Sequence, residues 1–382
     1  MIPSRAAQFA ASLLTVMAAG CVSGARAAGD WPSLDRALPP PLDASTASQR
    51  NVSNAVTAIS AGHDVSCALF LTGAVSCWGR NSGGYSPTPS RWMLPLAVQV
   101  SAYSEQVCIR TLDKRVLCGR PEGGLFEPTN EKVASLGNSA SSASAVSEAG
   151  NLIGWFANGR PWHGHAFAHE RATHVADGSS HWCARLESGR IMCGGKNGRG
   201  QLGDGTTTDQ WERATEVVDI TDAIDVTVGS EFSCALTQGG SAMCWGDNQF
   251  AQLGTRAEQV IPAVPPGAPS PPTYSATPRL VEGVNEVVQL SAGSSYACAM
   301  TRAGSLYCWG SNWQGQLGHS RSRWPAYPQL VRSVPTAAAV SAGIAHTCML
   351  ATNGEVICWG ANSHGESGAP PGPVAKPTRV FQ

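Results

Sequence analysis

The chain has 382 residues, a length that suits one large repeat protein or two ordinary domains. Only 14 % of the residues are charged, against roughly 25 % in an average soluble protein. The 42 glycines and 25 prolines are typical of many short strands joined by turns. The formal net charge is −1 and no basic stripe is visible, so a nucleic-acid partner is not expected.

The N-terminal segment predicts export. Arg5 is followed by an uncharged, mostly apolar run at residues 6–20, which is too short for a comfortable membrane span and typical of a signal peptide. Two cleavage sites compete, since the residues before Cys21 resemble a bacterial lipobox and Ala27 ends an ordinary signal-peptidase motif. We favour the lipobox, which would leave Cys21 lipidated at the new N-terminus. An uncleaved apolar helix is the remaining alternative.

These sites divide the chain into three parts. Residues 1–27 are predicted to form the signal peptide, residues 28–50 a flexible tether rich in Pro, Ser, Thr and Ala, and residues 51–382 the folded domain. The product would be either a lipid-anchored outer-membrane or cell-surface protein, or a periplasmic or secreted one.

Twelve of the 13 cysteines form six pairs, each separated by ten positions. A glycine, or Lys114 in one unit, lies six positions after the first cysteine of each pair, where a tight hairpin turn needs a positive φ. Antiparallel strands around such a turn place the two cysteines opposite each other, about 4.5–5.5 Å apart at Cα, which a disulfide can span. We therefore predict six disulfides: Cys67–Cys77, Cys108–Cys118, Cys183–Cys193, Cys234–Cys244, Cys298–Cys308 and Cys348–Cys358.

Two other interpretations of the cysteines are less well supported. Zinc sites favour cysteines two to four residues apart, and no Cys-x-x-Cys occurs in the chain. Reduced structural thiols in a cytosolic protein would fit the spacing, but the export signal favours an oxidising compartment.

The cysteine pairs anchor a longer repeat. In five units a glycine lies five positions before the first cysteine, and in four units Trp-Gly follows the second. An Asn in five units and a Gly-Gln-Leu-Gly type segment in four come next. A seventh unit without cysteines fits the same template, with Ser144 and Gly154 at the cysteine positions. We therefore predict an all-β, seven-bladed β-propeller with one intrablade disulfide in six of its seven blades. The recurring tryptophans are expected in the core: Trp78, Trp155, Trp245, Trp309 and Trp359.

The sequences of residues 291–301 and 304–318 resemble the regulator of chromosome condensation repeat. The resemblance covers residues 52–382, is strongest in the last four units and implies a seven-bladed propeller. Function does not follow from this fold. The founding nuclear member is a guanine-nucleotide exchange factor, an activity that export argues against, and a secreted propeller inhibitor of β-lactamases with a similar repeat acts by presenting one face of its ring.

Two positions between the repeated Asn and the following Gly change in every strong unit, as in the pairs Gly198/Arg199 and Gln249/Phe250. A rigid frame that displays variable loop residues is a common arrangement for recognition, and Trp, Tyr and Arg dominate binding hot spots. Packing between blades is the competing role for each of these side chains. The candidate contact residues are Arg199, Phe250, Trp313 and His364 in the variable pairs, and Trp92, Trp162, Trp211, Trp324 and Tyr327 in the longer segments.

A histidine-rich region, residues 163–181, offers the main alternative. His163 and His165 alternate along a predicted strand, so they face the same way and could share a metal with His169. Surface histidines without a metal are the competing interpretation. Asp204 to Asp209 lacks the acidic spacing of a calcium loop and is predicted to be a turn.

The sequence therefore predicts an exported, monomeric binding or scaffold protein without enzymatic activity, catalytic residues, bound metal or cofactor. It would recognise an unidentified protein partner in the envelope or extracellular space through loops on one propeller face. The alternatives are a metal-binding or enzymatic protein that uses the His163–His181 region, a guanine-nucleotide exchange factor, and a passive envelope component.

Overall fold

The computed structural model describes residues 55–81, 83–92, 95–121, 123–137, 143–155, 161–163, 167, 170–255, 273–372 and 374–381, with the backbone alone at 161–163, 323–325, 375 and 381. The predicted signal peptide and tether lie outside these residues. The described part of the chain contains no helix that is long and apolar enough to cross a membrane.

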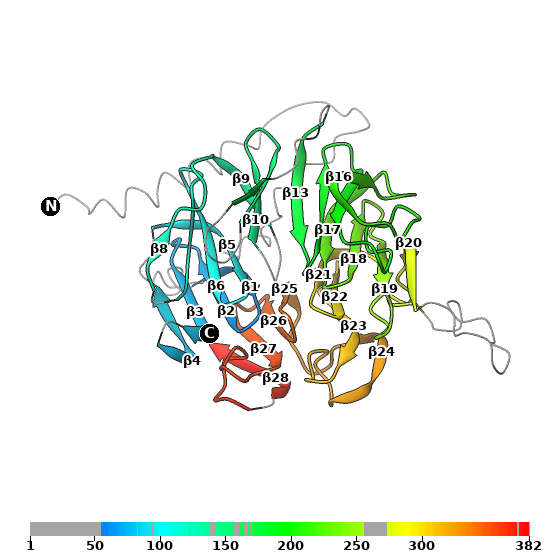
Figure 1. Cartoon of the computed structure of the whole chain (residues 1–382). Coiled ribbons are helices and arrows are strands. Elements are labelled where there is room, and N and C mark those ends of the chain that lie inside the picture. The colour runs from blue at the N-terminus through cyan, green and yellow to red at the C-terminus, as the bar shows by residue number, and fades with distance from the viewer. Residues whose placement is uncertain are drawn as a thin grey trace, which may run out of the picture. The chain divides into compact units, whose positions relative to one another are not determined.

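The described strands form seven four-stranded antiparallel sheets, each built from four consecutive strands (Figure 1). Each sheet is one blade of the propeller, and blades 1 to 7 follow the chain, so the predicted fold is confirmed. The strands are β1 (Val56–Ala61), β2 (Val65–Phe70), β3 (Val75–Asn81), β4 (Gly84–Trp92), β5 (Ala97–Tyr103), β6 (Gln106–Thr111), β7 (Val116–Gly119), β8 (Leu125–Phe126), β9 (Val133–Leu136), β10 (Ala143–Ser147), β11 (Leu152–Trp155), β12 (Pro161–His163), β13 (Ala172–Asp177), β14 (His181–Leu186), β15 (Ile191–Gly195), β16 (Gln210–Glu216), β17 (Ala223–Val228), β18 (Phe232–Thr237), β19 (Ala242–Asp247), β20 (Tyr274–Leu280), β21 (Val287–Ala292), β22 (Tyr296–Thr301), β23 (Leu306–Asn312), β24 (Ser322–Leu330), β25 (Ala337–Ala342), β26 (His346–Ala351), β27 (Val356–Gly360) and β28 (Val374–Phe381).

The second and third strands of each blade form the hairpin that the cysteine spacing predicts. In blade 6, Cys298 and Cys308 stand directly opposite each other, and Gly304 takes the turn with a φ of 74°. Lys114 adopts the same left-handed conformation, with a φ of 67°. All six predicted pairs have a Cα–Cα separation of 4.1 Å and are joined by disulfides: Cys67–Cys77, Cys108–Cys118, Cys183–Cys193, Cys234–Cys244, Cys298–Cys308 and Cys348–Cys358.

Blade 3 has the same hairpin without a bridge. Ser144 on β10 is paired directly with Gly154 on β11, in the register that the other blades use for their cysteines. The Ser144 hydroxyl instead donates a hydrogen bond to the buried carboxyl of Asp177 in blade 4. The seventh unit that the repeat template predicts is therefore a true blade.

The core lies between neighbouring blades. One cluster joins Tyr296 and Leu306 of blade 6 to Val340 and Trp359 of blade 7, and another joins blade 7 to blade 1. Burial of the apolar faces of both neighbours stabilises this arrangement, at roughly 25 cal/mol per Å² removed from water. The tryptophans at the repeated position are at most 2 % exposed, as predicted: Trp78, Trp155, Trp245, Trp309 and Trp359.

Adjacent blades are also joined at one backbone carbonyl, through what we call the carbonyl link. The Trp245 indole Nε1 donates to the carbonyl oxygen of Gln201 in the preceding blade at 2.9 Å, and the Ser233 hydroxyl donates to the same oxygen at 3.0 Å. A buried carbonyl without a donor costs about 1–3 kcal/mol, so the link fixes how the blades meet. The other links are Trp309 to Gln252, Trp359 with Thr347 to Gln316, and Trp78 with Ser66 to Glu366.

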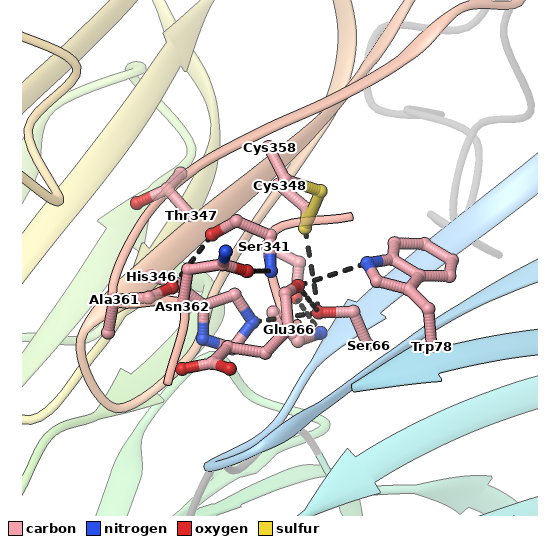
Figure 2. Close-up of a disulfide and its surroundings, with 12 residues drawn as sticks. Ser66, Trp78, Ser341, His346, Thr347, Cys348, Cys358, Ala361, Asn362 and Glu366 are labelled. Carbon is pink, nitrogen blue, oxygen red and sulfur yellow. Dashed lines mark hydrogen bonds between the residues drawn. A yellow bond between two sulfur atoms is a disulfide. The ribbon is translucent and has the colours of Figure 1, made fainter. Parts of the chain in front are cut away.

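The first strands of the blades are neighbours in a closed series, and β1 packs against β25 and β26 (Figure 1). Because none of the seven described sheets contains strands from both ends of the domain, closure depends on contacts between complete blades. Ser66 and Trp78 both reach the Glu366 carbonyl of blade 7, and Ser66 also contacts His346 (Figure 2). At the same joint a Cβ on Gly343 would lie 2.3 Å from the Gly62 carbonyl oxygen, so only glycine fits there.

The register of blade 3 predicts that a seventh disulfide can form. In the double variant Ser144→Cys/Gly154→Cys, the new cysteines should oxidise without rearrangement, because the pair already stands in register. The chain-entropy model gives a gain of about 2–3 kcal/mol for so short a loop, reduced by the lost Ser144 bond to Asp177. Thiol titration and denaturant unfolding of oxidised and reduced protein measure the bridge and the gain. Two free thiols in the folded oxidised protein would contradict the register.

Candidate functional site

The variable residue pairs lie on one face of the propeller. In each antiparallel blade, the turn between the first two strands and the loop between the last two strands are at the same end, and the hairpin turns are at the other. We call the end with the loops between the third and fourth strands the loop face. The four predicted contact residues from the variable pairs, Arg199, Phe250, Trp313 and His364, occupy equivalent loops of blades 4 to 7.

Two polar side chains hold each of these loops in place. In blade 6, the buried Asn312 accepts a hydrogen bond from the Leu317 amide at 3.1 Å, and Gln316 accepts one from the Gln314 amide at 2.9 Å. Such side-chain bonds to backbone amides fix a loop without a regular ladder. The equivalent framework pairs in the other loops are Asn197 with Gln201, Asn248 with Gln252, and Asn362 with Glu366.

The variable side chains project from this framework to different extents. Trp313 is 55 % exposed, a large apolar surface for a soluble protein to leave in water. Phe250 and Arg199 are partly buried, and the Arg199 guanidinium lies 3.9 Å from the Asp247 carboxylate. His364 is partly buried at the joint between blades 7 and 1.

The five other candidate contact residues have different surroundings. Trp211 on β16 is 63 % exposed and donates to Asp209, and Tyr327 on β24 is 40 % exposed. Trp92 is a correction, because it is only 7 % exposed and packs in the core between blades 1 and 2. The side chains of Trp162 and Trp324 lie outside the described residues. The segment from Asp204 forms the predicted turn, since the Asp204 carboxylate accepts the Thr206 amide at 2.9 Å.

The described part of the histidine-rich region does not form one cluster. His163 ends the short strand β12, whereas His165 and His169 lie outside the described residues. His181 is buried between blades, where its Nε2 is 2.9 Å from the Ser233 hydroxyl, and burial lowers its pKa to about 3. His181 therefore belongs to a blade interface and is not an open metal ligand.

The contact that His181 makes belongs to a pattern of matched pairs between blades. In each pair, one residue lies two positions before the first cysteine of its blade. It faces a residue of the following blade that lies one position before the first cysteine of that following blade. Tyr296 meets the Thr347 hydroxyl at 3.0 Å, and His346 meets the Ser66 hydroxyl at 2.7 Å. Where the pair is Phe232 and Ala297, neither side chain needs a hydrogen-bond partner.

A pocket of about 370 Å³ opens where blades 7, 1 and 2 meet. Its charged groups interact closely: the Arg80 guanidinium lies 3.3 Å from Asp64 and also contacts Glu105, which in turn lies 2.7 Å from Arg120. Burial raises the pKa of Glu366 nearby, although the His364 and Ser363 amides hydrogen-bond to its carboxylate. Apart from His364, sequence reasoning missed these residues, because they come from segments far apart in the chain.

These features define a seven-bladed β-propeller that displays variable side chains on one face. Models of the regulator of chromosome condensation (RCC1) repeat match residues 223–252, 287–316 and 337–366, and also 240–300 and 303–350, which lie in blades 5 to 7. The resemblance to this repeat that the sequence predicts is therefore confirmed in blades 5 to 7.

Two relatives are similar in sequence to about two thirds of this chain. The E3 ubiquitin-protein ligase HERC2 of mouse is 27 % identical over 68 % of the chain, and the ultraviolet-B receptor UVR8 of Arabidopsis thaliana is 26 % identical over 69 %. The chain spans only 5 % of HERC2 and 55 % of UVR8.

Solved structures resemble the whole fold. Yeast RCC1 (Prp20), crystallised bound to Kap60, has a TM-score of 0.53 at 18 % identity, with 86 % of this chain and 75 % of that chain covered. The ectodomain of the Physcomitrella patens receptor kinase CR4 has a TM-score of 0.50 at 17 % identity, with 80 % and 74 % covered. At these identities the likeness extends to the fold alone.

The two buried histidines predict a loss of stability in acid. Burial lowers the pKa of His181 and His346 from 6.5 to about 3, so the unfolded chain binds more protons between these values. The free energy of unfolding must then fall as the pH falls from about 6.5 to about 3, by up to about 1.4 kcal/mol per pH unit for each histidine. Burial raises the pKa of Asp177 to about 6, which acts in the opposite direction over the upper part of this range.

Denaturant unfolding at several pH values should therefore compare the wild type with a His181→Gln/His346→Gln variant. Glutamine can keep a hydrogen bond to Ser233 and Ser66 but does not titrate. The variant should lose less stability than the wild type between pH 6.5 and 4. Parallel pH profiles would contradict the structural assignment of these histidines.

Proposed function

We propose that this protein is a non-catalytic binding module that acts in an oxidising, extracytoplasmic compartment and recognises another protein through the loop face. The observation that carries the proposal is that each loop contains residues that fix its backbone and other residues that project from it. Buried Asn and Gln side chains fix the backbone, and the residues between them differ from blade to blade. A fixed frame with variable projecting side chains is suited to recognition and needs no reactive group.

The compartment is supported by the disulfides. Six bridges within one chain indicate an oxidising environment, since cytosolic thiols are normally kept reduced. The export signal and the lipidation of Cys21 remain part of the proposal. A propeller of similar fold forms the ectodomain of the receptor kinase CR4, which is consistent with use of the fold outside the cytoplasm.

The activities of the relatives carry less weight. The chain matches a small part of the ligase HERC2, so ligase activity cannot be assigned to it from that match. Exchange-factor activity would rest on fold alone, because a likeness at 18 % identity supports no common partner.

The chain offers a matched pair of variants for the test. Trp313→Ala/Phe250→Ala removes two aromatic side chains from the loop face. Leu71→Ala/Leu112→Ala removes two apolar side chains that are 50 % and 61 % exposed on the hairpin turns of the opposite face.

Affinity capture from native envelope extract identifies the partner, and titration of the purified partner measures each variant. The loop-face variant should bind at least tenfold more weakly, because aromatic hot spots contribute about 2 kcal/mol or more. The opposite-face variant should bind like the wild type. Loss of binding in the Leu71/Leu112 variant alone would assign recognition to the other face and refute the proposal.

A further inference from the structure

Three side chains that can ligate a metal meet where the last blade closes on the first. Asp64 lies in the turn between β1 and β2 of blade 1, and His364 and Glu366 lie in the loop between β27 and β28 of blade 7. One ligand atom from each residue lies within 4.8 Å of the others, and His364 Nδ1 is 3.4 Å from Asp64 Oδ1. The backbone of Glu366 is fixed there by Ser66 and Trp78 (Figure 2).

The cluster places negative charge in a buried joint. Asp64 is 7 % exposed and Glu366 only 2 %. Arg80 lies beside Asp64, but its guanidinium is shared with Glu105, which Arg120 also contacts. The two guanidinium groups thus contact Asp64 and Glu105, and the His63 imidazole lies 3.7 Å from Asp64. Buried charge such as that of Glu366 is unfavourable unless it is compensated.

The loop does not need a carboxylate at position 366 in order to form. The equivalent positions in the three preceding loops are Gln201, Gln252 and Gln316, and each amide oxygen accepts the same backbone N–H that Glu366 accepts from His364. A neutral amide performs the structural role in those blades. The second oxygen of Glu366 accepts the Ser363 amide at 3.0 Å, and its negative charge has no counterpart in those three loops.

His364 supplies a nitrogen donor that the protein does not use. Its Nδ1 is buried and makes no hydrogen bond within the described residues, although it points at Asp64. A protonated ring could form an ion pair with Asp64 at this distance, which is the competing explanation. His364 also lines the pocket of about 370 Å³, so the cluster borders open space.

We infer that Asp64, His364 and Glu366 bind one divalent transition-metal ion that joins the last blade to the first. One imidazole and two carboxylates form a donor set that suits Zn²⁺ or Mn²⁺, whereas Ca²⁺ and Mg²⁺ prefer oxygen ligands alone. Three protein ligands leave further positions for water or for a group of a bound partner. The sequence predicted a protein without bound metal, and this proposal departs from that prediction. The proposed site lies outside the histidine-rich region at residues 163–181.

The variant Glu366→Gln tests this site with little risk to folding, because it installs the residue that three other blades carry. Asp64→Asn is the second variant. Each protein is stripped with a chelator, and binding of Zn²⁺ and Mn²⁺ is measured by calorimetry together with the thermal midpoint. Ca²⁺ and Mg²⁺ serve as comparison ions.

The wild type should bind one Zn²⁺ or Mn²⁺ ion and unfold at a higher temperature with it. Glu366→Gln should bind at least tenfold more weakly, lose the metal-dependent rise and be as stable as the wild type without metal. Asp64→Asn should also bind at least tenfold more weakly. Equal binding in the wild type and Glu366→Gln, an equal response to Ca²⁺, or no binding by the wild type would overturn the assignment.

Discussion

The structure depends on a backbone carbonyl in the loop of one blade that accepts hydrogen bonds from the next blade. At Gln201 and Gln316 this oxygen receives both an indole N–H and a hydroxyl, and at Glu366 the same arrangement closes the ring. The residue that provides the carbonyl also uses its side chain to fix its own loop. In blades 4 to 7, blade packing and the display of variable side chains are therefore stabilised by one residue in each loop.

The early blades match the repeat poorly at both partners of this link. Blades 1, 2 and 3 lack the Gly-Gln-Leu-Gly segment. The blades that follow blades 1 and 3 carry Gly119 and Gly194 where others carry the donor tryptophan, whereas the blade that follows blade 2 keeps Trp155. In blade 4 the space is filled from across the hairpin, since Trp182 pairs with Gly194 and a Cβ there would lie 2.7 Å from its ring. Loss of the acceptor segment thus accompanies loss of the donor at two of the three early joints, and the strongest framework is in blades 4 to 7.

Features set by local spacing could be predicted from the sequence, including the disulfides and the unbridged pair of Ser144 and Gly154. Trp92 could not be assigned, because its burial depends on how blade 2 packs against blade 1. The proximity of Asp64 to Glu366 could not be predicted from the sequence either, because ring closure brings together residues that are distant in the chain. The one local signal was a glutamate where the equivalent units have glutamine.

Hydrogen exchange in the variant Trp359→Phe tests most directly whether the carbonyl link both joins blades and fixes the loop face. The ring remains apolar and aromatic, but the donor to the Gln316 carbonyl is lost. The amides of Gln314 and Leu317, in the loop of the preceding blade, should then exchange faster, whereas those of His364 and Ser367, in the variant's own blade, should keep their protection. Unchanged exchange at Gln314 and Leu317, or an equal increase in all loops, would contradict the account.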